Sequence, residues 1–354
     1  MDDVVQHLGE TIRAAAAQKR PLCIRGGGTK DFYGGPARGD LLSTAGCRGI
    51  VSYEPTELVI TARGGTPLAE IEAALAEKGQ MLAFEPPRFA EGTTLGGCVA
   101  AGLSGPRRAY AGAVRDFVLG VRILDGKGDD LRFGGQVMKN VAGYDVSRLM
   151  AGSLGTLGAL LEVSLKVLPR PAAEATLRIA CFEPEALEQM NRWASQPLPV
   201  SATAYRDGEL RVRLSGARVA VDAAAKRIGG DPVDPPDAER FWSGIRDQTD
   251  PWFAGSAPLW RLSVKSTTPP LDLPGPQTIE WGGALRWIRT DADAAAPRDA
   301  AARAGGHATL FRGGDKAVGV FHPLPPVMMK LHRNLKQAFD SAGVFNPGRL
   351  YPEL

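Results

Sequence analysis

The sequence predicts an α+β protein built in two parts. Three observations support this. The chain has 354 residues, more than one compact core usually needs. Stretches with the apolar pattern of strands alternate with stretches that have helical spacing. The pattern also changes after Pro169-Arg170-Pro171, which predicts a boundary between residues 1–170 and the rest.

The first part begins with apolar residues at helical spacing and continues with short apolar runs separated by glycines. Pro67 suits the first turn of a helix, and Gly79 suits the position that ends it. We therefore expect a helix over Val4–Lys19, strands over Pro21–Ile24 and Leu58–Ala62, a helix over Leu68–Lys78, and strands near Val118–Leu124 and Leu161–Val167.

The second part repeats strand and helix patterns as a separate α+β unit. We expect strands over Thr176–Phe182, Glu209–Leu214, Leu259–Lys265 and Gln277–Ile288, and helices over Glu185–Ala194, Ala217–Ile228, Ala294–Ala304 and Val327–Ala342. The proline-rich Asp231–Asp237 is interpreted as a link between the two halves of this unit.

Composition and charge exclude several classes of function. The 42 basic and 39 acidic residues are spread along the chain without a basic tract, so nucleic acid is not an expected partner. The four cysteines and four histidines show no metal-ligand spacing, and we expect no metal site and no iron–sulfur cluster. The sequence lacks both a run of eighteen apolar residues and a basic, then hydrophobic, N-terminus, which predicts a cytoplasmic protein.

Two glycine-rich loops carry the main chemical signal. The first, Arg25-Gly26-Gly27-Gly28-Thr29-Lys30, follows a strand, and its glycines allow a ligand to lie directly on backbone N–H groups. The alternative is a tight turn between a strand and a helix. In the second loop, Thr94 can cap a helix whose first turns contain Gly96 and Gly97, and Gly102-Leu103-Ser104-Gly105 follows.

A helix start without bulky side chains offers free N–H groups and a favourable dipole to a pyrophosphate. Neither loop has the G-x-G-x-x-G pattern, and the chain has no P-loop motif. The loops therefore predict that a dinucleotide is held by an arrangement other than the Rossmann fold.

A third element comprises Val137–Asp145 and the glycines 152, 155 and 158. These glycines either share one helical face or recur along a backbone that lies against a flat ligand. Close packing of one backbone on another is the alternative interpretation.

With these three elements in order, the sequence resembles FAD-binding flavoproteins of the vanillyl-alcohol oxidase type. It looks most like the FAD-binding subunits of bacterial glycolate oxidase complexes, most specifically over Thr94–Pro169, with Gly105–Tyr110 and Val114–Gly120 as close matches. Trp281–Trp287 and Gly305–Thr309 are similar to later signatures of those subunits.

The resemblance implies an FAD-binding domain of two α+β lobes over 1–170, a cap over 171–325, and a segment, 326–354, that packs back on the FAD-binding domain. It implies that the first two loops hold the pyrophosphate and adenosine. The residues concerned are Arg25, Gly26, Gly27, Gly28, Thr29, Lys30, Thr94, Gly96, Gly97, Gly102, Ser104 and Gly105. It places Gly112, Arg115 and Asp116 along the ribityl chain, Leu160 beside the adenine, and Asn140, Tyr144 and Asn346–Arg349 toward the isoalloxazine.

Two departures from the family bear on chemistry. Relatives with covalent flavin have histidine where this chain has Thr29, which implies non-covalent FAD. The related catalytic flavin subunit has glutamate where this chain has Leu154, and the paired metal histidines of related 2-hydroxy acid dehydrogenases are missing here.

Oxidation of a 2-hydroxy acid needs a cation for the carboxylate and a base for the hydroxyl proton. The candidate cations are Arg261, Arg286 and Arg349, and the candidate bases are His307 and Tyr144. Arg286 lies in a strand where alternation points it either at the flavin or at solvent, and solvent is the favoured interpretation.

Two functions follow from the resemblance. In the first, the chain is a redox-active subunit that handles electrons from glycolate or D-lactate, with a second, larger flavin subunit and an iron–sulfur subunit as partners. The alternatives are a non-catalytic flavin-binding scaffold and a stand-alone FAD-dependent dehydrogenase. Any membrane contact, at the inner face of the cytoplasmic membrane, would be made through those partners.

Overall fold

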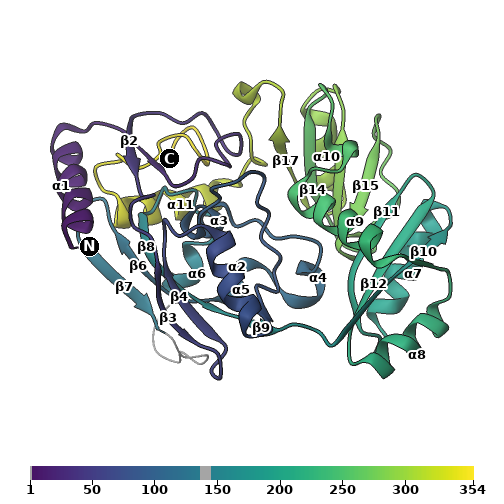
Figure 1. The fold of residues 1–354 in the computed structure, drawn as a ribbon. Helices are drawn as coiled ribbons and strands as arrows, with labels where there is room; N and C mark the ends of the chain where they lie inside the picture. Colours follow the sequence, from purple (N-terminus) through teal and green to yellow (C-terminus); the bar gives the residue numbers. More distant parts are fainter. Residues whose placement is uncertain (1, 136–144) are drawn as a thin grey trace.

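The computed structural model describes residues 2–135 and 145–354 and shows two bodies that follow one another along the chain (Figure 1). The strands before residue 170 lie in the first body. The strands from residue 173 onward form a single sheet in the second body. The change of sheet therefore falls where the sequence pattern changes, while the domain bounds themselves stay a prediction.

The larger lobe of the first body is an antiparallel sheet in the order β3-β4-β8-β6-β7. Its strands are Ile50–Glu54, Val59–Arg63, Ala159–Lys166, Val118–Leu124 and Asp130–Gly134. Helices α2 (Leu68–Glu77) and α3 (Leu95–Ala101) pack on it, because Ile71, Leu75 and Val99 join Ile60 and Val163 in one buried cluster. Short elements complete this lobe: β5 (Gln80–Met81), α4 (Arg108–Ala111), α5 (Val114–Phe117), α6 (Val146–Leu149) and β9 (Leu168–Pro169).

The smaller lobe is a parallel pair of strands, β1 (Leu22–Arg25) and β2 (Asp40–Ser43), covered by helix α1 (Asp2–Gln18). Leu8 and Ile12 of α1 pack on Leu22 and on Phe345 from the far end of the chain. The predicted helix over Val4–Lys19 and the strand over Pro21–Ile24 are confirmed with small shifts at their ends.

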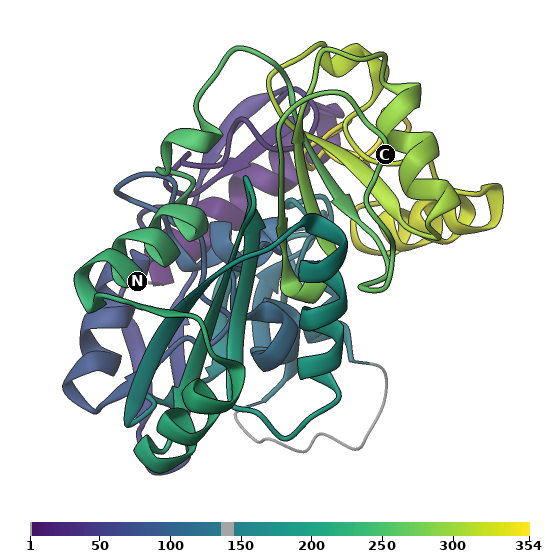
Figure 2. The same cartoon turned by 90° about the vertical axis from the view of Figure 1, so that its right-hand side faces the viewer.

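The second body is one antiparallel sheet in the order β13-β10-β12-β11-β15-β16-β14-β17. Figure 2 looks onto these strands, with the helices of the same body packed around them. The strands are Asp231–Val233, Ala173–Ala180, Glu209–Gly216, Val200–Arg206, Gln277–Glu280, Leu285–Arg289, Leu259–Ser263 and His307–Arg312. The helices are α7 (Glu183–Ala194), α8 (Arg218–Ile228), α9 (Pro235–Asp247) and α10 (Ala295–Arg303), and the short 3₁₀ turns are η1 (Pro251–Phe253), η2 (Trp281–Gly283) and η3 (Lys316–Val318).

Two predictions for this body are wrong. Asp231–Asp237 is not a linker, because β13 pairs with β10 and Pro235 starts helix α9. The expected strand over Gln277–Ile288 is two strands, since Trp281, Gly282 and Gly283 all have positive φ and turn the chain back into a hairpin.

Helix α11 (Pro326–Phe339) returns to the first body, where Leu335 and Phe339 pack against its main core (Figure 1). The buried Lys336 holds it there. Its Nζ donates to the Thr156 carbonyl at 3.0 Å, to the Phe345 carbonyl at 2.6 Å and to Asp340 Oδ2 at 2.8 Å. In the described part of the chain, no helix is long and apolar enough to cross a membrane.

Candidate cofactor site

The first glycine loop turns away from the end of β1, with Gly28 at φ +73°. Within the described residues, the backbone N–H groups of residues 27–30 have no protein acceptor. Consecutive free N–H groups in a turn form a concave site for an anion. A Cβ on Gly26 would overlap Thr94 Oγ1, and one on Gly27 would overlap the Gly92 carbonyl oxygen. Close packing therefore requires glycine here while the N–H groups stay available, and the residues that follow form turns, so the alternative of a turn between a strand and a helix is wrong.

The second loop differs from expectation in one respect. Thr94 does cap α3, and its Oγ1 accepts a hydrogen bond from Gly97 N at 3.3 Å. However, the Leu95 N–H donates to the Thr66 carbonyl at 2.9 Å, and the Gly96 N–H donates to the Gly64 carbonyl at 2.7 Å. The prediction that this helix start offers free N–H groups is wrong, because a neighbouring loop has already satisfied them. The available donors are in the first loop.

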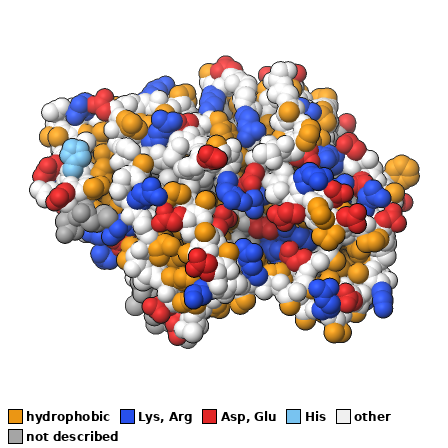
Figure 3. Space-filling view, viewed as in Figure 1, with side chains coloured by type: hydrophobic (Ala, Val, Ile, Leu, Met, Phe, Trp, Pro, Cys, Tyr) orange, Lys and Arg blue, Asp and Glu red, His pale blue; other side chains and the backbone are white. Residues whose placement is uncertain are grey.

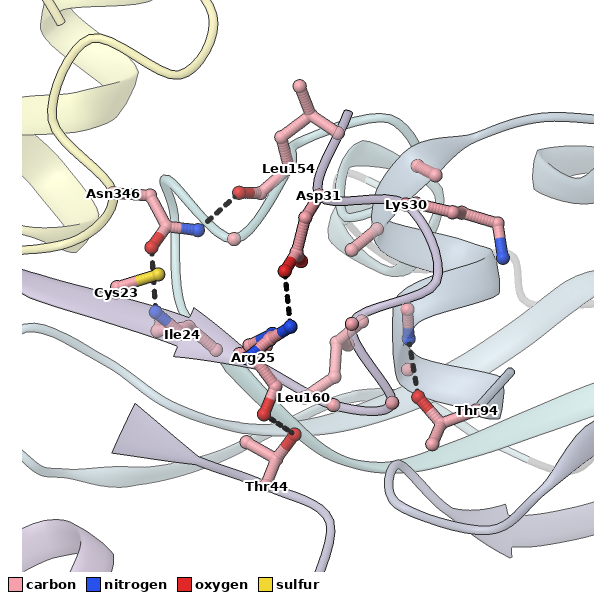
Figure 4. Close-up of a pocket in the computed structure, with 18 of the residues that line it drawn as sticks. Cys23, Ile24, Arg25, Lys30, Asp31, Thr44, Thr94, Leu154, Leu160 and Asn346 are labelled. Carbon is pink, nitrogen blue, oxygen red and sulfur yellow. Dashed lines mark hydrogen bonds and ion pairs between the residues drawn. The ribbon is translucent and has the colours of Figure 1, made fainter. Parts of the chain in front are cut away.

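A cavity with an empty volume of about 800 Å³ opens between the first loop, α3, β8 and the C-terminal turn. Figure 4 shows labelled side chains from these four segments around one space. The predicted residues that line it are Arg25, Gly26, Gly27, Gly28, Thr29, Lys30, Thr94, Gly96, Gly97, Leu160, Asn346 and Arg349.

The charges at the mouth of this cavity differ in availability. Arg25 pairs with Asp31 at 2.5 Å, and both side chains are about half exposed (Figure 4). Lys30 makes no ion pair within the described residues and lies 5.6 Å from the Phe89 ring. Burial lowers its pKa. The Lys30 ammonium is therefore directed toward Phe89 and away from the cradle (Figure 4).

Asn346 and Arg349 line the cavity but are held by the backbone. Asn346 Oδ1 accepts from Ile24 N at 2.7 Å, and its Nδ2 donates to the Leu154 carbonyl at 2.6 Å (Figure 4). Arg349 donates to the carbonyls of Asp31, Tyr33 and Gly35. The C-terminal turn therefore fixes the shape of the cradle. Burial lowers the pKa of Arg349.

Six predicted cofactor residues lie elsewhere. Gly102 ends α3 with φ +68° against Gly152, and Ser104 and Gly105 line a separate cavity between the two bodies. Gly112, Arg115 and Asp116 belong to a turn in which Asp116 Oδ2 accepts from Ala113 N at 2.8 Å. Asp116 therefore caps this turn, and none of the three residues lines the cradle.

The third sequence element is only partly described. Asn140, Tyr144 and the rest of Val137–Tyr144 lie outside the described residues. The segment with glycines 152, 155 and 158 is irregular rather than helical. Gly155, at φ +72°, and Gly158 line the cavity, as does Leu154 at φ +50°. This supports the interpretation of a backbone that lies along the ligand space.

Arg286 is not solvated as expected. It is fully buried, and it donates to the Gly283 carbonyl at 2.8 Å and the Thr268 carbonyl at 2.7 Å. Glu183 of α7 lies 3.4 Å away. Burial lowers the Arg286 pKa to about 10. Arg286 is therefore anchored within the second body, with its guanidinium facing neither solvent nor the cradle.

The strand register brings other candidates to the boundary between the bodies. Arg261 pairs with Trp287, and His307 pairs with Ser263, two residues along from Arg261. Partial desolvation of the His307 ring, then the charge of Arg261, lowers the pKa of His307. Glu280, which sequence reasoning missed, lines the boundary cavity with Arg261. A charged residue between Ile279 and Trp281 in an apolar strand was the available signal.

The chain is similar to several flavoproteins. A family model described as "FAD binding domain" matches residues 4–134. The glycolate oxidase subunit GlcE of Escherichia coli is 51% identical over 352 residues, covering 99% of both chains. This chain therefore belongs to the family of the glycolate oxidase subunit GlcE. It carries an FAD-binding domain and has FAD as its cofactor.

More distant similarities agree with this assignment. The glycolate oxidase subunit GlcD of Bacillus subtilis is 35% identical over 180 residues, which cover 50% of this chain and 37% of that protein. A solved structure of alkyldihydroxyacetonephosphate synthase superposes with a TM-score of 0.67 at 16% identity, covering 98% of this chain and 76% of that one. That likeness, together with antiparallel sheets, confirms the predicted fold and excludes a Rossmann domain.

Proposed function

We propose that this chain is the FAD-binding subunit of a complex that oxidises glycolate or D-lactate, and that it carries the electrons toward an iron–sulfur partner. A second, larger flavin subunit completes the proposed assembly. The observation that carries the proposal is the 51% identity to GlcE over 99% of both chains, together with a cavity shaped by the glycine loops. FAD-linked 2-hydroxy acid dehydrogenases among the other relatives point to the same chemistry.

The residues of the cradle suit a dinucleotide held without a covalent bond. The free N–H groups of residues 27–30 would bind the pyrophosphate. Thr29 Oγ1 is hydrogen-bonded to Thr93 Oγ1 at 2.8 Å and orients the loop. When bound, FAD supplies the acceptor for the hydride and electrons.

A scaffold function is the second candidate, and two observations favour it. Leu154 packs in an apolar cluster at the cavity, where the related catalytic subunit has glutamate. Within residues 2–135 and 145–354, no three His, Cys, Asp or Glu side chains lie close enough together to bind a metal. In this case the FAD would stabilise the assembly without being reduced.

The experiment uses the reconstituted complex with either the wild-type chain or a Gly97→Asp variant expected to lack FAD. Glycolate or D-lactate is added anaerobically, and the bleaching of oxidised flavin absorbance is recorded. The difference between the two complexes reports the flavin of this subunit, after the flavin content of each is measured. Bleaching in the difference spectrum supports a redox-active subunit. An unchanged difference spectrum, with bleaching confined to the partner flavin, would establish the scaffold function instead.

A further inference from the structure

A second, smaller cavity lies between the two bodies, and the functions above leave it unassigned. Its empty volume is about 320 Å³. One wall is the segment Leu103–Pro106, which follows the C-terminus of α3. The other wall comes from the large sheet and includes Arg261, Glu280 and Trp287. A hydrogen bond from Trp281 Nε1 to the Gly105 carbonyl, 3.0 Å long, ties the two walls together.

The register of the sheet explains why these side chains meet. Arg261 of β14 is paired with Trp287 of β16, while Leu285 of β16 is paired with Glu280 of β15. Residues two apart on a strand share a face, so Arg261, Trp287 and Glu280 lie on one face. Arg286 falls on the opposite face, which explains why it is anchored against Glu183 and is absent from this cavity.

Glu280 is a buried carboxyl with one oxygen still available. Its side chain is only 3% exposed, and Oε1 accepts from Trp287 Nε1 at 2.6 Å. Within the described residues, Oε2 makes no protein hydrogen bond, and the carboxyl forms no ion pair. Burial raises the pKa of Glu280 to about 8. A buried carboxyl that is neutral near pH 7 can donate one hydrogen bond.

Arg261 is a cation held by aromatic rings instead of by a carboxylate. Its guanidinium lies 5.0 Å from the centre of the Trp281 ring and 5.9 Å from that of Trp287. No hydrogen bond or ion pair to its guanidinium is found in the part of the chain that the structure describes. Such a guanidinium keeps its planar set of donors free for a carboxylate ligand.

We propose that this cavity binds a small 2-hydroxy or 2-oxo acid, with the ligand carboxylate on Arg261 and its hydroxyl or oxo oxygen hydrogen-bonded to Glu280. The inference deepens the proposed function by naming the residues that bind its substrate. This cavity is much smaller than the cofactor cavity by the same measure, which excludes a nucleotide or a sugar and leaves room only for a small ligand. The apolar walls, which include Leu285, Trp287 and Phe311, exclude water from the two polar groups.

The charge of Glu280 decides how binding depends on pH. The groups that face it are Arg261 on β14 and Glu85 in the loop after β5, with Arg246 of α9 on the same cavity wall. Tyr33 interacts electrostatically with Arg261, and burial raises the pKa of the Tyr33 hydroxyl. Below about pH 8 Glu280 is neutral, so Arg261 attracts the ligand anion unopposed. Above that pH, the Glu280 carboxylate repels the anion, and affinity falls.

The test is equilibrium binding of oxalate, a planar acid that resembles the substrate but is not oxidised, to the FAD-loaded protein. Calorimetry and tryptophan fluorescence are measured from pH 6 to 9. We expect saturable binding that weakens at least several-fold as pH rises through about 8. Arg261→Met should weaken binding more than about tenfold. Glu280→Gln, which has nearly the same shape, should keep binding at pH 7 and lose its dependence on pH.

The matched control is Arg312→Met, because Arg312 also rests on an aromatic ring, 4.6 Å from the centre of Phe32, but does not line the cavity. It should bind oxalate as the wild type does.

The proposal is overturned by an absence of oxalate binding at 10 mM, chosen as roughly ten times a weak millimolar affinity. It is also overturned if Glu280→Gln keeps the wild-type pH dependence, a result that does not depend on the folding of the arginine variant. Binding requires no electron transfer, so a flavin that glycolate does not bleach would contradict the proposed function and leave this result intact.

Discussion

Asn346 Nδ2 donates a hydrogen bond of 2.6 Å to the Leu154 carbonyl in the wall of the cofactor cavity (Figure 4). The same side chain accepts from Ile24 N at 2.7 Å. One amide therefore joins β1, the loop before β8 and the C-terminal turn. These three segments are far apart in the sequence, and each contributes to the wall of the cradle.

Asn346→Ala should lower both stability and cofactor retention. The substitution leaves a backbone donor and a backbone acceptor unsatisfied, which costs about 1–3 kcal/mol for each group. We expect the ratio of FAD to purified protein to fall several-fold, measured by absorbance after desalting. The control is Asn191→Ala, because Asn191 makes a similar bridge from Leu187 to Ser266 within the second body. Equal loss of FAD in both variants would refute a local role for Asn346.

Gly97→Asp should abolish FAD retention by placing a negative charge in the cradle. A Cβ at Gly97 would meet only Thr94 Oγ1, at 3.2 Å, so the chain itself has room for a side chain. Gly97→Asn has the same size without the charge and is the matched comparison. Retention should be markedly weaker for the aspartate variant, because a buried carboxylate repels phosphate. A purified aspartate variant that stays yellow with stoichiometric FAD would contradict the placement of the cofactor.

FAD should be released completely when the protein is denatured. Thr29 stands where relatives with covalent flavin have histidine, and the part of the cavity wall that the structure describes contains no histidine. The measurement is flavin absorbance in the supernatant after acid precipitation, with the pellet examined for fluorescence on a denaturing gel. Flavin that remains with the polypeptide would show that another residue forms a bond to it.

The contribution of Glu280 to stability should decline as pH rises. Its folded-state pKa, about 8, lies above the ordinary value of 4.5, so the folded protein holds a proton that the unfolded chain has lost. Stability from this group is therefore full below pH 4.5 and is lost progressively up to pH 8. Relative to the wild type, Glu280→Gln should gain on the order of a few kcal/mol in free energy of unfolding between pH 5 and 8.5. Urea denaturation at both pH values measures this, and parallel curves would contradict it.

Local features of the fold could be predicted from the sequence where neighbouring residues decide them. Thr94 caps α3 and Gly79 follows the end of α2 as expected, because these motifs involve only a few adjacent residues. The break between β15 and β16 could also have been anticipated from Gly282 and Gly283. The proline-rich Asp231–Asp237 was misread because proline at an edge strand or at a helix start looks the same in sequence as proline in a linker.

The candidate site was harder to predict because distant contacts decide which groups are free. The carbonyls that accept hydrogen bonds from the Leu95 and Gly96 N–H groups belong to a loop some thirty residues earlier in the sequence. Likewise, the alternation of side chains along β16 does not show which face of this strand is directed toward the first body. The pairing with β14 and β15 decides it, directing Trp287 to the cavity and Arg286 away. Glu280 is a candidate ligand-binding group because it is buried beside Trp287, and no sequence motif indicates that burial.

The amide bridge of Asn346 has a consequence for biosynthesis. Because the bridge joins Ile24 to Asn346, a chain still being synthesised on the ribosome cannot complete the cradle until residue 346 has emerged. A chain that ends before residue 346 would lack this bridge even though all of its glycine loops are present. The wall of the cradle therefore depends on the synthesis of a segment 322 residues away from Ile24.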